Sequence, residues 1–172
     1  MRRWVDLWNG ETVTARGAGL GVVGLVAASI RLAASLQAYP AQGDAGHFVQ
    51  CAVEFNSAGF SGMSSYWSQG PILLAASAIR AGLDPSYVLQ GMTLISGVAV
   101  AVLTACFVWV WFRRWPSAFV AGLLMAVNPF SILYSVNGLA EMPYTALLLG
   151  ASVAVAMRIR DRDCRSWGLL LS

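Results

Sequence analysis

Lysine is absent from this sequence, and charge of either sign is scarce. All 11 basic residues are arginine, only 8 residues are acidic, and charged residues make up 11% of the chain, against about 25% in ordinary soluble domains. Hydrophobic residues make up 58% of the 172 residues, and the mean hydropathy is +0.64. This balance excludes an ordinary soluble domain and predicts an integral membrane protein. We expect no nucleic-acid partner, because the arginines mark membrane topology instead.

Several patterns that carry chemistry are also missing. The three cysteines, Cys51, Cys106 and Cys164, lack metal-ligand spacing and fall at different predicted depths, so we expect packing roles for them. No glycine-rich phosphate loop follows a predicted strand, which argues against a nucleotide-sugar enzyme of the α/β type. Residues 1–16 contain no long apolar core, so this stretch is not predicted to be a cleaved signal peptide.

Four apolar segments are long enough to cross a bilayer, which takes about 20 helical residues. They cover 17–36, 88–112, 117–134 and 142–157. A fifth apolar run begins at Trp167 and stops with the chain at Ser172. The predicted fold is therefore all-α, a single membrane domain over 1–172. It has about four complete transmembrane helices and a truncated fifth, and we expect it to be the N-terminal portion of a larger module.

The arginines predict the orientation of these spans. Nine of the eleven arginines fall within 1–16, 113–114 and 158–165, which alternating spans place on one side of the membrane. Because short cytoplasmic loops collect arginine, we expect the N-terminus to be cytoplasmic and the loop 37–87 to be extracytoplasmic. The predicted location is the plasma membrane or bacterial inner membrane.

The outer loop 37–87 is too long to be a simple connector, and its pattern predicts helices. From Asp44 onward, apolar residues recur with helical spacing at Phe48, Cys51, Ala52 and Phe55. Polar residues take the opposing face, at His47, Gln50, Glu54 and Ser57. This pattern predicts an amphipathic helix lying along the membrane surface. A second apolar run that opens at Pro71 is too short to span, so we expect another interfacial or re-entrant helix ending before "AGLDP".

Two acidic residues are the strongest candidates for chemistry. Asp44 precedes the first surface helix, so its carboxylate either caps that helix or serves a catalytic role, and the two readings are compatible. Glu141 begins the fourth span, where a charge must reach water or a partner, although it could simply end the span near Pro143. The topology places both on the outer side. There, one carboxylate could act as a general base while the other binds or orients a polar substrate.

Three further residues are candidates for substrate binding, namely His47, Arg31 and Glu54. His47 could equally be a capping-turn partner, a proton carrier or a surface polar residue. Arg31 lies inside the first span, where it could pair with either acid or extend its guanidinium outward to water. Glu54 falls on the polar face of the first surface helix.

The order of these features resembles a known enzyme class. The stretches "GDAGHF", "SQGPILLAASAI" and "NPFSILYSVNGLAEMPYTALLL" resemble the N-terminal part of GT-C glycosyltransferases. More narrowly, they are similar to dolichyl- or polyprenyl-phosphate-mannose protein mannosyltransferases and related bacterial envelope enzymes. The resemblance implies that Asp44 is the catalytic carboxylate and that Glu141 helps to build the same site. It also implies a polyprenyl-phosphate sugar donor, a lipid, glycan or protein acceptor, and direct attack with inversion at the anomeric carbon.

One alternative function and one cofactor question stay open on the sequence. The alternative is a non-catalytic small membrane subunit or transporter fragment, in which Arg31, Asp44 and Glu141 serve only for pairing or permeation. In either case, membrane lipid and either further C-terminal helices or a partner subunit are expected to surround these spans. Two carboxylates suit Mg²⁺ or Mn²⁺, but they do not by themselves specify a metal site.

Overall fold

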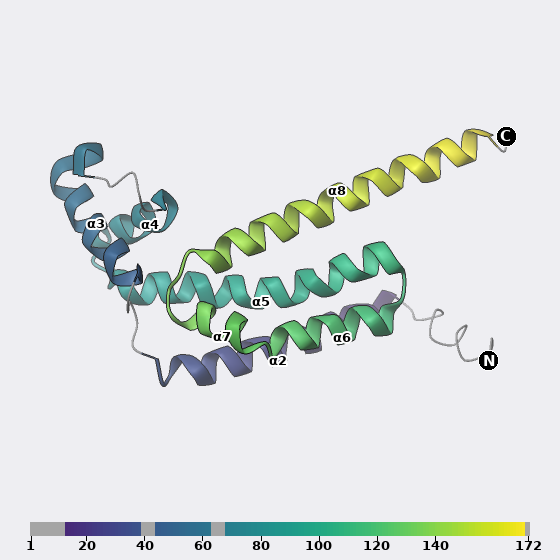
Figure 1. Ribbon diagram of the computed structural model, residues 1–172, viewed down its shortest axis with the longest axis horizontal. Coiled ribbons are helices and arrows are strands. Elements are labelled where there is room, and N and C mark those ends of the chain that lie inside the picture. Colours follow the sequence, from purple (N-terminus) through teal and green to yellow (C-terminus); the bar gives the residue numbers. More distant parts are fainter. Residues whose placement is uncertain (1–12, 39–43, 63–67, 171–172) are drawn as a thin grey trace.

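The structure is a computed structural model that describes residues 13–38, 44–62 and 68–170, with the side chains of the last helix described as far as Ile159. Every regular element in these ranges is helical, which confirms the all-α prediction (Figure 1). The elements are α2 (Val13–Ser35), α3 (Asp44–Ala58), the 3-10 turn η1 (Gly59–Gly62), α4 (Gln69–Arg80), α5 (Pro85–Phe112), α6 (Trp115–Ala126), α7 (Pro129–Val136) and α8 (Glu141–Leu170).

The long helix α5 lies at the centre and contacts α2, α4, α6, α7 and α8. Small residues let its neighbours approach closely, as is common between helices in membranes. At the α2–α5–α6 contact, Ala27, Ala101 and Ala126 are buried around Val23. A Cβ atom added to Gly122 would lie 2.9 Å from the Cβ of Ala105, so glycine is required at that position.

Three helical stretches are long and apolar enough to cross a membrane, judged by length and composition. They are Thr14–Ser35, Pro85–Phe112 and Glu141–Ile159. The pair α6 and α7 would count as a fourth crossing, but its two helices are bent by 53° at the break between them. The chain thus has three to four candidate spans, in agreement with a multi-pass membrane protein.

The predicted span 117–134 is not one continuous helix, and the local sequence explains why. Asn128 caps α7, where its side chain accepts a hydrogen bond of 3.0 Å from the backbone N–H of Ser131. Pro129 follows as the first residue of α7. Because proline has no N–H to donate and its ring clashes with the preceding turn, α6 cannot continue through it.

The last helix also differs from the prediction. The arginine-rich stretch 158–165, which we expected to be a loop between a fourth and a fifth span, is part of the continuous helix α8, and so is Trp167. The sequence from Met157 to Trp167 contains no glycine or proline, and arginine is a good helix former.

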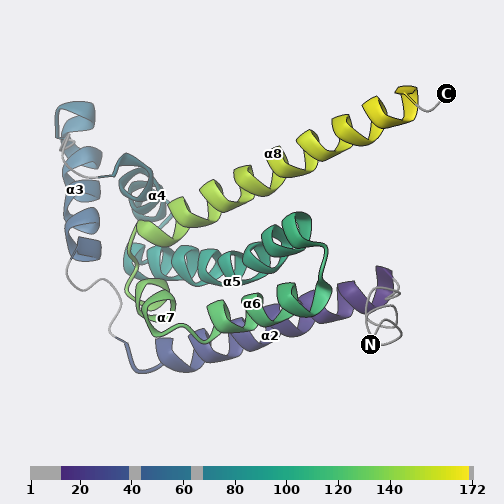
Figure 2. The same ribbon diagram turned by 45° about the vertical axis from the view of Figure 1, so that its right-hand side comes forward.

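The helices α3 and α4, which lie within residues 37–87, form a cap on one end of the bundle (Figure 2). The predicted apolar face of α3 is confirmed, since Phe48, Cys51, Ala52 and Phe55 are buried. This face packs against α4, against Leu89 of α5 and against Ala140 just before α8. The predicted polar face is exposed. The second predicted helix is confirmed as α4, which ends at Arg80 before "AGLDP".

Candidate functional site

Asp44 and Glu141 are the first residues of α3 and α8, and both side chains are exposed. The starts of these two helices lie against each other. A Cβ atom added to Gly138, in the turn before α8, would lie 3.2 Å from the Cβ of Ala45, and Ala140 is buried in the same apolar cluster as Phe48. Packing of α3 onto this turn therefore brings the two acidic positions to the same end of the molecule.

The helix starts give both carboxylates a favourable electrostatic setting. The backbone N–H groups of a first helical turn have no partners within the helix and carry partial positive charge, which stabilises a nearby anion. Asp44 lies inside this first turn, so of the two readings left open for it, the capping one does not describe its position. Among the described residues, no hydrogen bond involves the carboxylate of Asp44 or that of Glu141. Both are therefore accessible to a ligand from solvent.

The other two exposed candidates lie at different distances from Asp44 along α3. His47 is three residues from Asp44, so the two side chains share one face of the helix. Glu54 is about 15 Å further along the helix axis than Asp44, and its carboxylate accepts a hydrogen bond of 3.2 Å from the Gln50 amide. The structure thus places His47 on the same face of α3 as Asp44, and Glu54 further along the helix.

Arg31 lies in the interior of the helix bundle, with none of its side chain exposed. Its guanidinium donates to Ser135 Oγ at 3.1 Å, to Ser131 Oγ at 2.7 Å and to the carbonyl oxygens of Ala126 at 3.0 Å and Ala27 at 3.2 Å. These four acceptors are neutral. We expected Arg31 either to pair with an acid or to extend toward water, and these contacts show neither. Its buried position is also separate from the exposed carboxylates of Asp44 and Glu141.

The break between α6 and α7 explains why an arginine is buried at this place. In a continuous helix, the Ala126 carbonyl would accept a hydrogen bond from the residue four positions later, but the chain turns at Asn128 and Pro129 instead. The last carbonyl groups of α6 are therefore left without helical partners and carry the negative end of its dipole. A planar, permanently charged guanidinium can satisfy several such oxygens at once.

The hydrogen bonds continue from Arg31 into a buried network that the sequence analysis missed. Ser135 Oγ donates to the Ser131 carbonyl at 2.6 Å, and Thr93 Oγ1 donates to the Ser135 carbonyl at 2.7 Å. Gln90 Nε2 donates to the Val136 carbonyl at 3.0 Å. The available signal was the recurrence of polar residues with helical spacing inside two apolar segments. This network fixes α7, and with it the turn that leads to Glu141.

The described residues contain no group of three or more His, Cys, Asp and Glu side chains that could hold a metal ion. Asp44 and Glu141 offer hard carboxylate oxygens from only two side chains, fewer than the six or more oxygen ligands around Ca²⁺ or Mg²⁺. A divalent cation at this end would have to complete its coordination with water, with a bound phosphate or with residues outside the described ranges.

The chain was also compared with known protein families, with curated proteins and with solved structures. None of the three comparisons gives a match.

Proposed function

We propose that this chain belongs to a membrane glycosyltransferase of the GT-C type. It would transfer a sugar from a polyprenyl-phosphate donor to an acceptor at the extracytoplasmic face of the membrane. The observation that carries the proposal is the packing of α3 on the turn before α8. This packing sets Asp44 and Glu141 at one end of the bundle, with His47 on the same face as Asp44. The resemblance of the sequence to that enzyme class supplies the chemistry.

In the proposed reaction, Asp44 accepts the proton of the acceptor hydroxyl as that oxygen attacks the anomeric carbon of the donor sugar. The bond between the anomeric carbon and the phosphate oxygen breaks at the same time, and the polyprenyl phosphate leaves with the bonding electrons. Attack from the opposite side inverts the anomeric configuration. Glu141 orients the reacting groups, and His47 contributes to substrate binding.

The proposed sidedness rests on the placement of the arginines. The first turn of α2, the turn between α5 and α6, and the later half of α8 all lie at the end opposite α3 and α4 (Figures 1 and 2). The arginine-rich stretches near these elements would face the cytoplasm under the positive-inside rule. The cap that carries Asp44 would then face outward.

Substitution of the acidic residues tests the reaction. In membranes containing the natural product of this reading frame, Asp44→Asn is expected to lower mannosyl transfer from polyprenyl-phosphate mannose by about 100-fold or more, because general-base catalysis contributes about 10²–10⁴-fold. Glu141→Gln is expected to lower transfer and also to weaken retention of the radiolabelled donor.

The matched control is Asp84→Asn. Asp84 is an exposed acid at the start of α5 whose carboxylate accepts a hydrogen bond of 2.8 Å from Ser86 N–H. Asparagine caps a helix about as well as aspartate, so this variant removes one negative charge at the same end and keeps the cap. Full transfer activity in Asp44→Asn, or an equal loss in Asp84→Asn, would refute the assigned role of Asp44.

A non-catalytic membrane subunit is the second candidate, and the exposed surface of α8 is where a partner helix would pack. Only 17% of the apolar window of α8 is buried, and Leu147, Leu148, Val155 and Ile159 are all more than half exposed. Partner helices could cover this face. Recovery of one stoichiometric membrane partner with the purified chain, together with unchanged transfer activity in Asp44→Asn, would favour this function over the first.

A further inference from the structure

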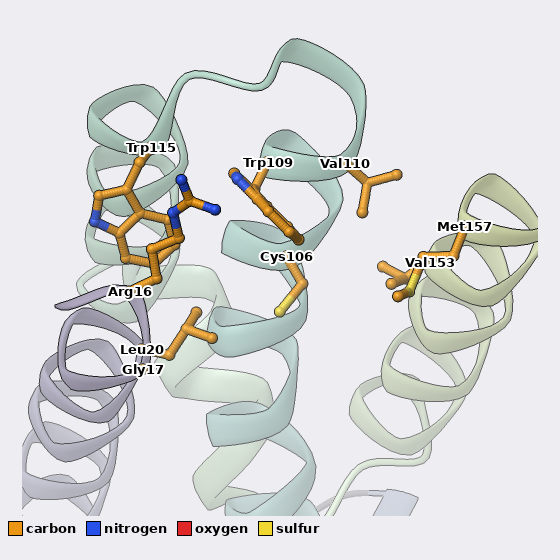
Figure 3. Close-up of a pocket in the computed structure, with 9 residues that line it drawn as sticks. All are labelled: Arg16, Gly17, Leu20, Cys106, Trp109, Val110, Trp115, Val153 and Met157. Atoms are coloured by element: carbon orange, nitrogen blue, oxygen red, sulfur yellow. The ribbon is translucent and has the colours of Figure 1, made fainter. Parts of the chain in front are cut away.

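A pocket of about 310 Å³ lies across the face of α5 at the end of the bundle opposite Asp44. Figure 3 shows α5 in the middle, with side chains of α2 and α6 on one side and of α8 on the other. The lining is mostly apolar and includes Leu20, Cys106, Val153 and Met157. The volume is near the lower limit of small-ligand pockets, which span about 300–1,000 Å³.

One edge of this pocket is cationic. Arg16 lines the pocket, and its guanidinium lies 5.5 Å from the centre of the Trp109 ring. The guanidinium of Arg113 lies 4.9 Å from the same ring, but Arg113 does not line the pocket. Arg16 Nε is buried and has no hydrogen-bond acceptor among the described residues. A buried donor without an acceptor is costly, so the geometry favours a ligand that brings an anionic oxygen to Arg16.

The surroundings place this pocket where lipid is available. Aromatic residues gather at this end of α5 and α6, and Trp111 and Phe112 are exposed beside Arg113 and Arg114. Such belts of aromatic and cationic side chains are typical of the boundary between a bilayer and water. Only 17% of the apolar window of α2 is buried, so most of that window presents its side chains to the medium around the bundle.

We propose that this pocket binds one anionic phospholipid. An acyl chain would lie against Leu20, Cys106 and Val153, and the phosphate would accept hydrogen bonds from Arg16. A zwitterionic lipid offers the same chain without the net negative charge, so Arg16 would select the anionic headgroup. This inference requires the long helices to lie in a bilayer, and it is independent of sugar transfer.

Two glycines of α2 provide a matched test of acyl-chain binding. Gly17 lines the pocket, whereas Gly21, one turn further on, does not. A Cβ atom added at either position meets no other atom within 4 Å, so a side chain can begin at both positions without a clash at its Cβ. The purified protein would be reconstituted with a phosphatidylglycerol that carries a photoreactive diazirine in its acyl chain. Adducts formed on illumination would be mapped by mass spectrometry.

We expect adducts on α2, α5 and α8 at the pocket-lining residues, and competition by unlabelled phosphatidylglycerol but not by phosphatidylcholine. Gly17→Phe is expected to remove most of these adducts, and Gly21→Phe is expected to keep them. Equal competition by the two lipids would refute headgroup selection. Equal adduct yields in both glycine variants would refute the pocket as a lipid site. It would also be refuted if the pocket were found joined to another segment of the protein instead of to lipid.

The headgroup contact has its own test. Arg16→Gln should reduce the preference for phosphatidylglycerol over phosphatidylcholine by about fivefold, the effect of roughly one basic residue near an anionic lipid surface. Arg114→Gln removes the same charge at the same end, but Arg114 does not line this pocket. If Arg114→Gln reduced the preference as much as Arg16→Gln, the selection would come from the general surface charge and the assigned contact would be wrong.

Discussion

Arg31 is the residue on which the middle of the bundle depends. It reaches α6 and α7 from α2 through three hydrogen bonds, to the Ala126 carbonyl, Ser131 and Ser135. The sequence alone identified Arg31 as a charge inside an apolar segment, but not its partners, because they lie about one hundred residues away along the chain. Hydropathy identifies a residue as polar, but the hydrogen-bond acceptors of its side chain depend on how the helices pack.

Replacement of Arg31 should destabilise the protein without unfolding it. Polar contacts between helices in membranes contribute about 0.6 kcal/mol each on average, so Arg31→Met is expected to lose about 2 kcal/mol of unfolding free energy over three contacts. Arg31→Lys keeps the charge but not the planar fork, so it should recover less than half of the loss. Unfolding by a denaturing detergent would measure both. Stability equal to that of the parent in Arg31→Met would contradict the assigned role.

Gly97 tests how tightly the same network is packed. A Cβ atom at Gly97 would collide with Ser135 Oγ and Arg31 Nε, whereas one at Gly91, on the same helix, meets nothing within 4 Å. Gly97→Ala should therefore cost about 1–3 kcal/mol. Gly91→Ala should be neutral or gain up to about 1 kcal/mol from helix propensity. Unfolding in a denaturing detergent would measure both variants. Equal unfolding free energies for Gly97→Ala and Gly91→Ala would contradict the prediction.

At the scale of elements, the pattern of side chains was more informative than summed hydropathy. The spacing of Phe48, Cys51, Ala52 and Phe55 correctly predicted both α3 and its buried face. The summed hydropathy of 117–134 did not predict the bend between α6 and α7. The local sequence did contain a signal for it, because Asn128 followed by Pro129 is typical of a helix start. The arginine cluster after Met157 indicated a loop, because a topology rule counts charges and does not consider helix propensity.

The bend itself gives a prediction about Asn128. Its side chain caps α7 through the Ser131 N–H, so Asn128→Ala should cost about 1 kcal/mol of stability, while Asn128→Asp or Asn128→Ser, which keep an acceptor, should cost little. Thermal unfolding in detergent measures the three variants. An equal loss of stability in all three variants would show that the side-chain cap of Asn128 does not stabilise the start of α7.

At the scale of the whole molecule, the sequence predicted that Asp44 and Glu141 share one end, and their helices do start side by side. The sequence did not predict the contact between Ala45 and Gly138 that brings these helix starts together. Neither residue has a polar or reactive side chain that would single it out in a sequence. Small residues become informative only when the packing is known.

The membrane orientation can be tested with single cysteines at Ser61 and Ser117, in a background without Cys51, Cys106 and Cys164. Both serines are exposed, and they lie at opposite ends of the bundle. In intact cells, an impermeant thiol reagent should label the cysteine at Ser61 and not the one at Ser117. The reverse pattern would place Asp44 and Glu141 in the cytoplasm and would rule out a reaction on the outer face.

The continuity of α8 links the two ends mechanically. Glu141 begins this helix, and Met157 lies on the same rod about 24 Å away, beside the pocket across α5. Because an uninterrupted helix transmits tilt along its length, α8 would behave as a lever, with its pivot where it packs on α5. Swinging of its far half toward or away from α5 would displace the carboxylate at its start, and paired spin labels on α5 and at each end of α8 would report that motion.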